Sequence, residues 1–311
     1  MTPATPTPPP ARVLVTGAAG LIGRGVLHQL DRSGIAATAL VLADPGDLPV
    51  DRIVVGSATD PSAVAEALTG ADAVIHLAAI PAPDLASAPE VFGMNTRATY
   101  TVLDAAGAAG IRRISIASSI NALGIRFSPD PAATPPTLPL SAESATIAAD
   151  AYSVSKWADE FTAAALSRAY GFDVVALRLP LVGGLGEVPE LDDRLLGDAA
   201  EIAADPSLGA SDLWLYLETR DAAAAMIAAL SPRQPGAHVL HVAAPEVSVP
   251  YPTESLLDRY WPQVPRRRRF PGREAPVDLL AAERLIGFTA RHTLAAGSRP
   301  IPDPAATTLE R

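Results

Sequence analysis

Cysteine is absent from the 311 residues of this chain, and aromatic residues make up only 5% of it. Without thiols there is no disulfide, no thiolate nucleophile and no cysteine-ligated metal. Few aromatics beside abundant alanine predict tight packing of helices on a sheet rather than an aromatic-rich binding surface. The sequence also has no apolar run long enough to span a bilayer and no ligand spacing typical of a metal site. These absences favour small-molecule chemistry that needs neither thiols nor a metal.

Basic residues are outnumbered: the chain has 24 of them and 34 acidic residues, which gives a net charge of −10. This balance argues against nucleic acid as a partner. The proline-rich N-terminus, residues 2–10, lacks the basic and apolar regions of a signal peptide. We therefore expect a cytoplasmic protein whose partner is a small-molecule substrate, with neither a membrane nor nucleic acid involved.

Lysine is nearly absent too, because Lys156 is the single lysine among the 24 basic residues. An ammonium is a compact point charge on a flexible stem, whereas a guanidinium is a planar fork. Tyr152 precedes Lys156 by four residues in a helix-compatible run, so both side chains lie on one helix face. The ammonium then favours the ionised phenol and makes Tyr152 a general acid or base for a carbinol proton. Chance survival of one lysine in an arginine-biased composition is the competing interpretation.

Apolar strand-like runs alternate with helix-compatible stretches over the first 180 residues. This alternation predicts an α/β fold with a Rossmann-type doubly wound parallel sheet and a smaller C-terminal substrate lobe. The Rossmann domain is expected over residues 11–180, and the lobe mainly over residues 181–296. A strand and a helix near residues 213–242 are expected to return to the Rossmann core. Residues 1–10 are expected to be a disordered tail and residues 297–311 a loose one. The strands are predicted at residues 12–16, 38–42, 52–55, 73–77, 114–117 and 174–179, with looser candidates at 213–217 and 239–242.

A glycine-rich turn joins the first predicted strand to the first helix. Gly17 allows the tight turn, Gly20 lets backbone approach a diphosphate, and Gly23 lets the helix pack close to the strand. The diphosphate is then expected at the helix N-terminus, where free N–H groups and the helix dipole attract anions. A purely structural turn is the alternative.

Asp44 follows the second strand, 21 residues after Gly23, and carries the choice of cofactor. A carboxylate there accepts hydrogen bonds from the adenosine ribose diol and repels a 2′-phosphate, which favours NAD over NADP. Two alternatives stay open. Asp44 also suits the opening of the turn at residues 44–47, and Arg24 is placed to meet a phosphate.

Small and polar residues follow the later strands, where ligands of an open parallel sheet bind. Ala78 and Ala79 leave room for a cofactor after the fourth strand, and Pro180 follows the sixth. Ser118 and Ser119 end the fifth strand. His76 lies inside a strand, so we assign it a structural rather than a catalytic role.

Taken together, these residues resemble the extended short-chain dehydrogenase/reductase family, in its NAD-dependent epimerase/dehydratase branch. The matching segments cover nearly the whole chain between the tails. They are TGAAGLIG at 16–23, HLAA at 76–79, Asn95 in a long helix, Ser118-Ser119, the Tyr152–Lys156 pair, LRLP at 177–180, RDA at 220–222 and ERLIGF at 283–288.

The resemblance implies a hydride-transfer site. Tyr152 exchanges the carbinol proton, Lys156 holds the nicotinamide ribose, and Ser119 hydrogen-bonds the reacting oxygen, with Ser118 as the alternative. It also implies a homodimer through the helices predicted at residues 89–109 and 152–169. The implied NAD-binding residues are Gly17, Gly20, Leu21, Ile22, Gly23, Asp44, Ala78, Ala79, Asn95, Tyr152, Lys156 and Pro180.

Departures from the family pattern restrict the reaction. Ile120-Asn121 stands where the branch's dehydratases carry an aspartate–glutamate pair, so dehydration is disfavoured. Residues 181–183 lack the asparagine with which many sugar-nucleotide epimerases hold a diphosphate, which weakens the nucleotide-sugar interpretation. Asn121 is a candidate for contacting a substrate hydroxyl, although a turn role suits it equally. The basic run at residues 266–269 is either a solvated loop or a contact for an anionic substrate.

The sequence thus predicts an NAD-dependent oxidoreductase that acts on a secondary alcohol or ketone of a sugar-like or sugar-acid substrate. Two alternatives remain. One is a sugar or nucleotide-sugar epimerase that uses the same residues and retains its cofactor. The other is a dinucleotide-binding regulator without turnover, against which the intact tyrosine, lysine and serine argue.

Overall fold

A computed structural model describes residues 8–188, 191–295 and 297–301. Its centre is a seven-stranded sheet with the order β3-β2-β1-β4-β5-β6-β9, in which every neighbouring pair is parallel. This confirms the predicted α/β, Rossmann-type class. The strands are β1 (Arg12–Thr16), β2 (Ala36–Val41), β3 (Arg52–Val55), β4 (Ala73–His76), β5 (Arg113–Ser119), β6 (Asp173–Leu179) and β9 (Ala237–His241).

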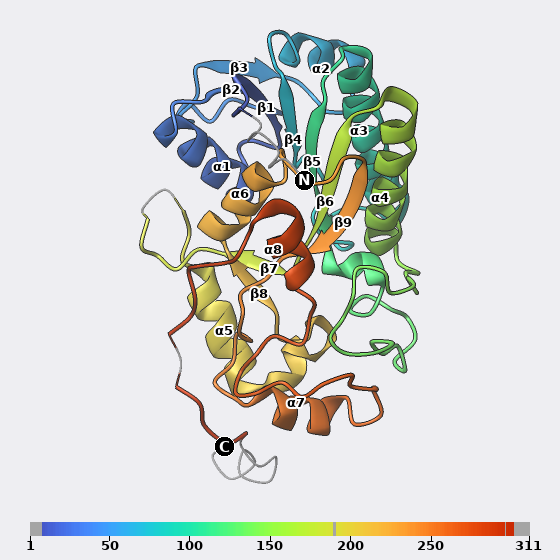
Figure 1. Ribbon diagram of the computed structural model, residues 1–311, viewed down its shortest axis with the longest axis vertical. Coiled ribbons are helices and arrows are strands. Elements are labelled where there is room, and N and C mark those ends of the chain that lie inside the picture. Colours follow the sequence, from blue (N-terminus) through green and yellow to red (C-terminus); the bar gives the residue numbers. More distant parts are fainter. Residues whose placement is uncertain (1–7, 189–190, 296, 302–311) are drawn as a thin grey trace, which may run out of the picture.

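Helices cover both faces of the sheet (Figure 1). Side chains alternate along each strand, so Val13 and Val15 of β1 enter one apolar core and Leu14 enters the other. Helices α1 (Leu21–Arg32), α6 (Thr219–Ala228) and α8 (Leu280–Ile286) contribute to the first core. Helices α2 (Pro61–Ala67), α3 (Ala88–Ala108) and α4 (Ala151–Tyr170) contribute to the second. The strands are therefore buried on both sides, which explains their continuous apolar sequences.

The strand order reverses between β1 and β4, because β1 leads outward to β2 and β3 while β4 leads the other way to β5 and β6. In open α/β sheets, ligands bind beyond the carboxyl ends of the strands at such a switch point. The glycine turn after β1 and the residues after β4 flank it directly.

The C-terminal lobe has its own small sheet and core. β7 (Leu181–Gly183) pairs in parallel with β8 (Tyr216–Glu218), and Trp214, Tyr251 and Phe270 are fully buried in a separate apolar cluster. Its other elements are α5 (Arg194–Ala204), α7 (Thr253–Tyr260) and the 3-10 helix η2 (Pro206–Asp212). β9, which precedes α7 in the chain, belongs instead to the main sheet and pairs there with β6.

The strand expected at residues 213–217 is displaced, and it does not return to the main sheet. It begins only at Tyr216, because Leu213 and Trp214 both take left-handed φ values of 55° directly after η2. Its partner is β7 of the lobe. The helix predicted next is α6, which packs against α1, and β9 overlaps the strand expected at residues 239–242 and pairs with β6 of the main sheet.

Both predicted tails lie largely outside the described residues. The described helices include none with the length and apolarity to cross a membrane. Nor does the described part of the chain bring together three histidine or acidic side chains suited to a metal ion.

Two buried histidines make the stability of this fold depend on pH. Burial lowers the pKa of His76 from 6.5 to about 3, with the nearby Lys156 adding to the effect. Burial, then the charge of Arg178, lowers the pKa of His241 equally, to about 3. Each histidine stays neutral in the folded protein while the unfolded chain takes up a proton below pH 6.5. The stability from each is therefore complete above pH 6.5 and is lost as pH falls towards 3.

We predict that the free energy of unfolding, measured by urea denaturation, falls between pH 7 and pH 4.5 through these histidines. Each should contribute a loss of the order of 2 kcal/mol. The variant His241→Gln should lose less stability over this interval, because its side chain takes up no proton. His238 lies on the same strand and is more exposed, so His238→Gln should keep the wild-type slope. Equal slopes for both variants would contradict the prediction.

Candidate active site

The glycine turn is built for close approach of backbone. Gly17 has a φ of 64°, and a Cβ there would lie 2.8 Å from the Ala78 nitrogen. A Cβ on Gly23 would lie 2.5 Å from the Gly17 carbonyl oxygen. Because these two glycines have no side chain, the turn can contact the end of β4 and the first turn of α1 closely.

Gly20 differs, because it is exposed and a Cβ there would meet only the Gly17 carbonyl oxygen, at 3.2 Å, among the described residues. It is also the N-cap of α1, makes no side-chain cap, and precedes a first turn without acidic residues. The first N–H groups of α1 thus face an open, uncrowded space. Such a helix end suits a diphosphate, so this region fits a dinucleotide.

The carboxylates beyond β2 lie on an exposed turn. Asp44 is three residues past the end of the strand, and one of its oxygens accepts a hydrogen bond from the Gly46 N–H at 2.8 Å. The turn role left open by the sequence is thus present, and it leaves the second oxygen for a ligand. Arg24 is held by Asp47 through two hydrogen bonds of 3.0 and 2.9 Å, and this guanidinium lowers the pKa of Asp47.

Asn95 fixes the segment that follows β4. Its amide exchanges hydrogen bonds with the Ile80 backbone, at 2.7 and 3.1 Å, and donates another to Ser155 at 3.0 Å. Asn95 is fully buried. It therefore joins α3, the segment after Ala78 and Ala79, and the residue just before Lys156, so it can shape a cofactor site by positioning the backbone.

Helix α4 carries the tyrosine and the lysine. Asp150 caps its N-terminus by accepting the Ser153 N–H at 2.9 Å. Tyr152 is 7% and Lys156 5% exposed, and the Lys156 ammonium lies 5.9 Å from the centre of the Tyr152 ring. Lys156 Nζ donates to the Ala117 carbonyl of β5 at 2.9 Å. The predicted pairing of a phenol and an ammonium on one helix face is therefore present.

The serines that end β5 have different surroundings. Ser118 is buried and donates its hydroxyl proton to Glu160 at 2.5 Å. Ser119 accepts the Asn121 N–H at 3.1 Å, which begins the 3-10 helix η1 (Ile120–Leu123). That bond uses an oxygen lone pair of Ser119 and not its hydroxyl proton, whereas the hydroxyl proton of Ser118 is engaged by Glu160.

Glu160 belongs to a buried ion pair that the sequence did not reveal. Both of its oxygens accept hydrogen bonds from Arg178 of β6, each at 2.8 Å. Arg178 is 4% exposed and also donates to the Ala142 carbonyl. This pair ties α4 to β5 and β6 beneath the tyrosine.

A second buried polar chain leads from the glycine turn to α4. Thr16 hydrogen-bonds His76 Nδ1 at 2.8 Å, and His76 Nε2 lies 3.2 Å from the Thr99 hydroxyl. Thr99 in turn adjoins the carboxyl of Asp159 and lowers its pKa, and Asp159 Oδ2 is 3.8 Å from Lys156 Nζ. His76 thus has the structural role expected of it, whereas Asp159 was not anticipated.

Residues of the lobe and the neighbouring loop complete the surroundings. The Phe127 ring meets the Tyr152 ring edge-on, with centres 6.1 Å apart. In the basic run, Arg266 pairs with Glu254 and Asp258, and Arg268 pairs with Glu274. These two arginines are engaged by carboxylates of their own lobe, which favours a structural role for the run.

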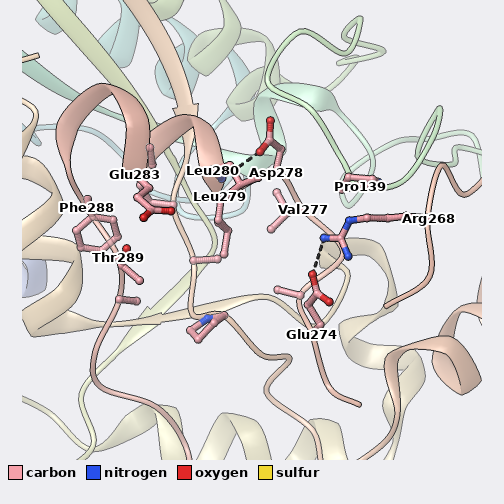
Figure 2. Close-up of a pocket in the computed structure, with 16 residues that line it drawn as sticks. Pro139, Arg268, Glu274, Val277, Asp278, Leu279, Leu280, Glu283, Phe288 and Thr289 are labelled. Carbon is pink, nitrogen blue, oxygen red and sulfur yellow. Dashed lines mark hydrogen bonds and ion pairs between the residues drawn. The ribbon is translucent and has the colours of Figure 1, made fainter. Parts of the chain in front are cut away.

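A cavity of about 250 Å³ lies in the C-terminal lobe next to α8 (Figure 2). Phe288, Thr289 and Leu279 line one side, and Arg268 and Glu274 form an ion pair on the other. A second hollow, of about 580 Å³, is lined by residues of β9 and α8. The residues lining either space do not include Tyr152, Lys156 or Ser119. Both are therefore distinct from the surroundings of these three side chains.

Comparison with known proteins agrees with this geometry. Residues 13–243 match the family model described as "NAD dependent epimerase/dehydratase family". The chain belongs to this family. NAD is therefore its cofactor, and it is an enzyme of the extended short-chain dehydrogenase/reductase type. Its relatives include sugar dehydrogenases and epimerases.

Two curated relatives bear on the substrate. L-arabinose 1-dehydrogenase (NAD(P)(+)) of Haloferax volcanii is 34% identical over 189 residues, which cover 59% of this chain and 72% of that one. The 3-diazoavenalumate denitrifying reductase of a Streptomyces species is 30% identical over 312 residues, covering 96% and 94%. Among solved structures, MoeE5 in complex with UDP-glucuronic acid and NAD shares the fold, with a TM-score of 0.65 at 24% identity over 90% of this chain and 94% of that one.

We predict that Glu160→Gln destabilises the protein by about 3–5 kcal/mol, because it leaves the buried Arg178 guanidinium without a balancing charge. Ser118→Ala should cost about 1 kcal/mol, the value of one hydrogen bond. The control is Glu187→Gln, which breaks a more exposed pair with Arg220 and should cost less than about 1 kcal/mol. Urea denaturation measures all three, and an effect of Glu160→Gln no larger than that of Glu187→Gln would refute the structural role.

Proposed function

We propose that this enzyme transfers a hydride between NAD and a secondary alcohol or ketone of a sugar-like or sugar-acid substrate. The observation that supports this most strongly is the buried pairing of Tyr152 with Lys156, anchored to β5 two residues before Ser119. Bound NAD supplies the hydride acceptor, and the chain supplies orientation and proton handling.

The three catalytic side chains then have separate roles. Tyr152 takes the proton of the carbinol, or returns it in the reverse direction. Lys156 stabilises the phenolate with its charge and is placed to hold the nicotinamide ribose. Ser119 donates its hydroxyl proton to the reacting oxygen, whereas the proton of Ser118 is engaged by Glu160.

We propose the cofactor site along the carboxyl edge of the sheet. The diphosphate lies over Gly20 and the first turn of α1, and Asp44 meets the adenosine ribose with its second oxygen. Asn121, half-buried in η1, and the lobe of residues 181–296 face the substrate. The cofactor contacts proposed are Gly17, Gly20, Leu21, Ile22, Gly23, Asp44, Ala78, Ala79, Asn95 and Pro180.

The test is a panel of free sugars, uronic acids and sugar nucleotides supplied with NAD and followed by the absorbance of NADH. With the substrate so found, Tyr152→Phe should lower kcat by roughly 10²–10⁴-fold, the usual contribution of a general acid or base, and leave NAD binding intact. Tyr170→Phe is the matched control, because that hydroxyl sits at the far end of α4 on Asp104. Full activity in Tyr152→Phe would end the proposal.

An epimerase is the principal alternative, because it uses the same side chains and retains its cofactor. Such an enzyme purifies with NAD bound and interconverts its substrates without net NADH formation.

A second candidate is a reductase of an aromatic diazo acid, the substrate type in the name of the Streptomyces relative. The match to that relative covers 96% of this chain, whereas the arabinose dehydrogenase match covers 59%. NADH consumption with a diazo-substituted aromatic acid, in place of NADH formation with sugars, would select this candidate.

We further propose a homodimer through α3 and α4. Their outer surfaces carry exposed large apolar side chains, which are unusual on a water-facing helix pair. Phe92 and Tyr100 of α3 are 40% and 54% exposed, and Trp157 and Phe161 of α4 are 46% and 65% exposed. The spacing of Trp157 and Phe161, one helical turn apart, places both on one stripe.

The double variant Trp157→Glu/Phe161→Glu should therefore be monomeric by light scattering at micromolar concentration, whereas the wild type should be dimeric. Leu208→Glu alters an exposed leucine of η2 away from these helices and should leave the dimer intact. A monomeric wild-type protein would refute the proposed interface.

A further inference from the structure

Asp159 extends the tyrosine–lysine face of α4 by one more charged group. Residues 152, 156 and 159 are spaced i, i+4 and i+7, so their side chains lie on one stripe of the helix. The rise of an α-helix puts Asp159 about 10 Å along the axis from Tyr152, with Lys156 between them. A carboxyl group thus stands directly behind the ammonium that serves the phenol.

The Asp159 carboxyl is buried and incompletely paired. The residue is 2% exposed. Its Oδ2 lies 3.8 Å from Lys156 Nζ, and its buried Oδ1 has no hydrogen-bond partner among the described residues. Burial raises the pKa of Asp159 from 3.8 to about 6, opposed mainly by the charge of Lys156 and the Thr99 hydroxyl. This group therefore changes charge within the range in which enzymes work.

The groups that face Asp159 come from three elements. Lys156 and Glu160 belong to α4 itself, Thr99 reaches it from α3, and His76 of β4 stands behind Thr99. The charge of Glu160 is balanced by Arg178, and His76 is neutral because burial lowers its pKa to about 3. Lys156 is therefore the charged neighbour whose electrostatic effect changes when Asp159 gains or loses a proton.

The hydrogen bonds of the neighbouring chain run towards Asp159. The Thr16 oxygen accepts N–H bonds from Leu77 and Ala78, each at 3.2 Å, so its hydroxyl proton is directed to His76 Nδ1. With that direction, His76 Nε2 carries the proton that faces the Thr99 hydroxyl, and Thr99 lowers the pKa of the Asp159 carboxyl. The polar contacts from the glycine turn to α4 thus end at one carboxyl.

We propose that Asp159 is a positioning residue that sets how much of the Lys156 charge acts on the Tyr152 phenol. When Asp159 is ionised, it holds and partly cancels the ammonium. When it is protonated, the full charge of Lys156 favours the phenolate. This inference rests on the proposed roles of Tyr152 and Lys156, and it assigns their adjustment to a residue that touches neither substrate nor cofactor.

The size of the effect follows from Coulomb's law. A unit charge about 10 Å away, at an effective dielectric constant of about 20, moves a titration midpoint by about one pH unit. In Asp159→Asn the carboxylate is replaced by a neutral group of the same shape. The midpoint of Tyr152 ionisation should therefore fall by about one pH unit, and the acid limb of the pH–rate profile should move the same way.

The experiment follows tyrosine ionisation directly and needs no substrate. The full chain with saturating NAD is labelled with ¹³C at tyrosine Cζ, the Tyr152 signal is assigned from its loss in Tyr152→Phe, and the signals are titrated. The control is Asp104→Asn on α3, where the carboxyl accepts the Tyr170 hydroxyl at 2.7 Å and raises the pKa of Tyr170. It should move the Tyr170 signal to a lower midpoint and leave that of Tyr152 in place.

The outcomes separate this inference from the proposed function. An unchanged or raised Tyr152 midpoint in Asp159→Asn overturns the role of Asp159. A Tyr152 midpoint that does not rise in Lys156→Met overturns the activation of the phenol, and with it the proposed catalytic site. Should Asp159→Asn fail to fold, Asp159→Ala removes the same charge, and the same downward shift is expected.

Discussion

The site depends on the interactions that hold the buried ammonium of Lys156. A charge that is 5% exposed must be met by partners, and here they are the Ala117 carbonyl and the Asp159 carboxyl. These partners fix α4 at one height along β5, which in turn fixes where the Tyr152 phenol emerges. The Glu160–Arg178 pair fastens the same helix to β6. The packing of α4 and the placement of Tyr152 therefore depend on one set of buried polar contacts.

Buried polar contacts join the glycine turn after β1 to helix α4. The end of β1, the end of β4 and the helices α3 and α4 all contribute to the chain from Thr16 to Asp159. A buried polar chain of this kind specifies one arrangement of its elements, because any shift leaves several groups unsatisfied. The glycine turn after β1 and helix α4 are thus held in one relative position.

Local patterns in the sequence predicted most of the fold, because the central strands are buried on both faces and Gly17 and Gly23 have a steric reason. The first and third strands, residues 12–16 and 52–55, were placed with the bounds that the structure has. The failures lie where tertiary contacts override local pattern. Leu213 and Trp214 look like strand residues but turn left-handed under a lobe core, and α5 was not predicted. At the site, Asp159, Glu160 and Arg178 carry charges whose burial no local pattern reveals.

The last strand of the main sheet has a consequence for how the chain is made. β9 pairs with β6 in a register that joins Val174 to Ala237, so the lobe elements β7, α5, η2 and β8 are an insertion between neighbouring strands. During synthesis, β6 leaves the ribosome well before β9, which will pair with its edge. Until then the unpaired edge of β6 can pair with another chain and cause aggregation. A chain cut between β6 and β9 therefore yields two fragments, and neither of them contains the complete sheet.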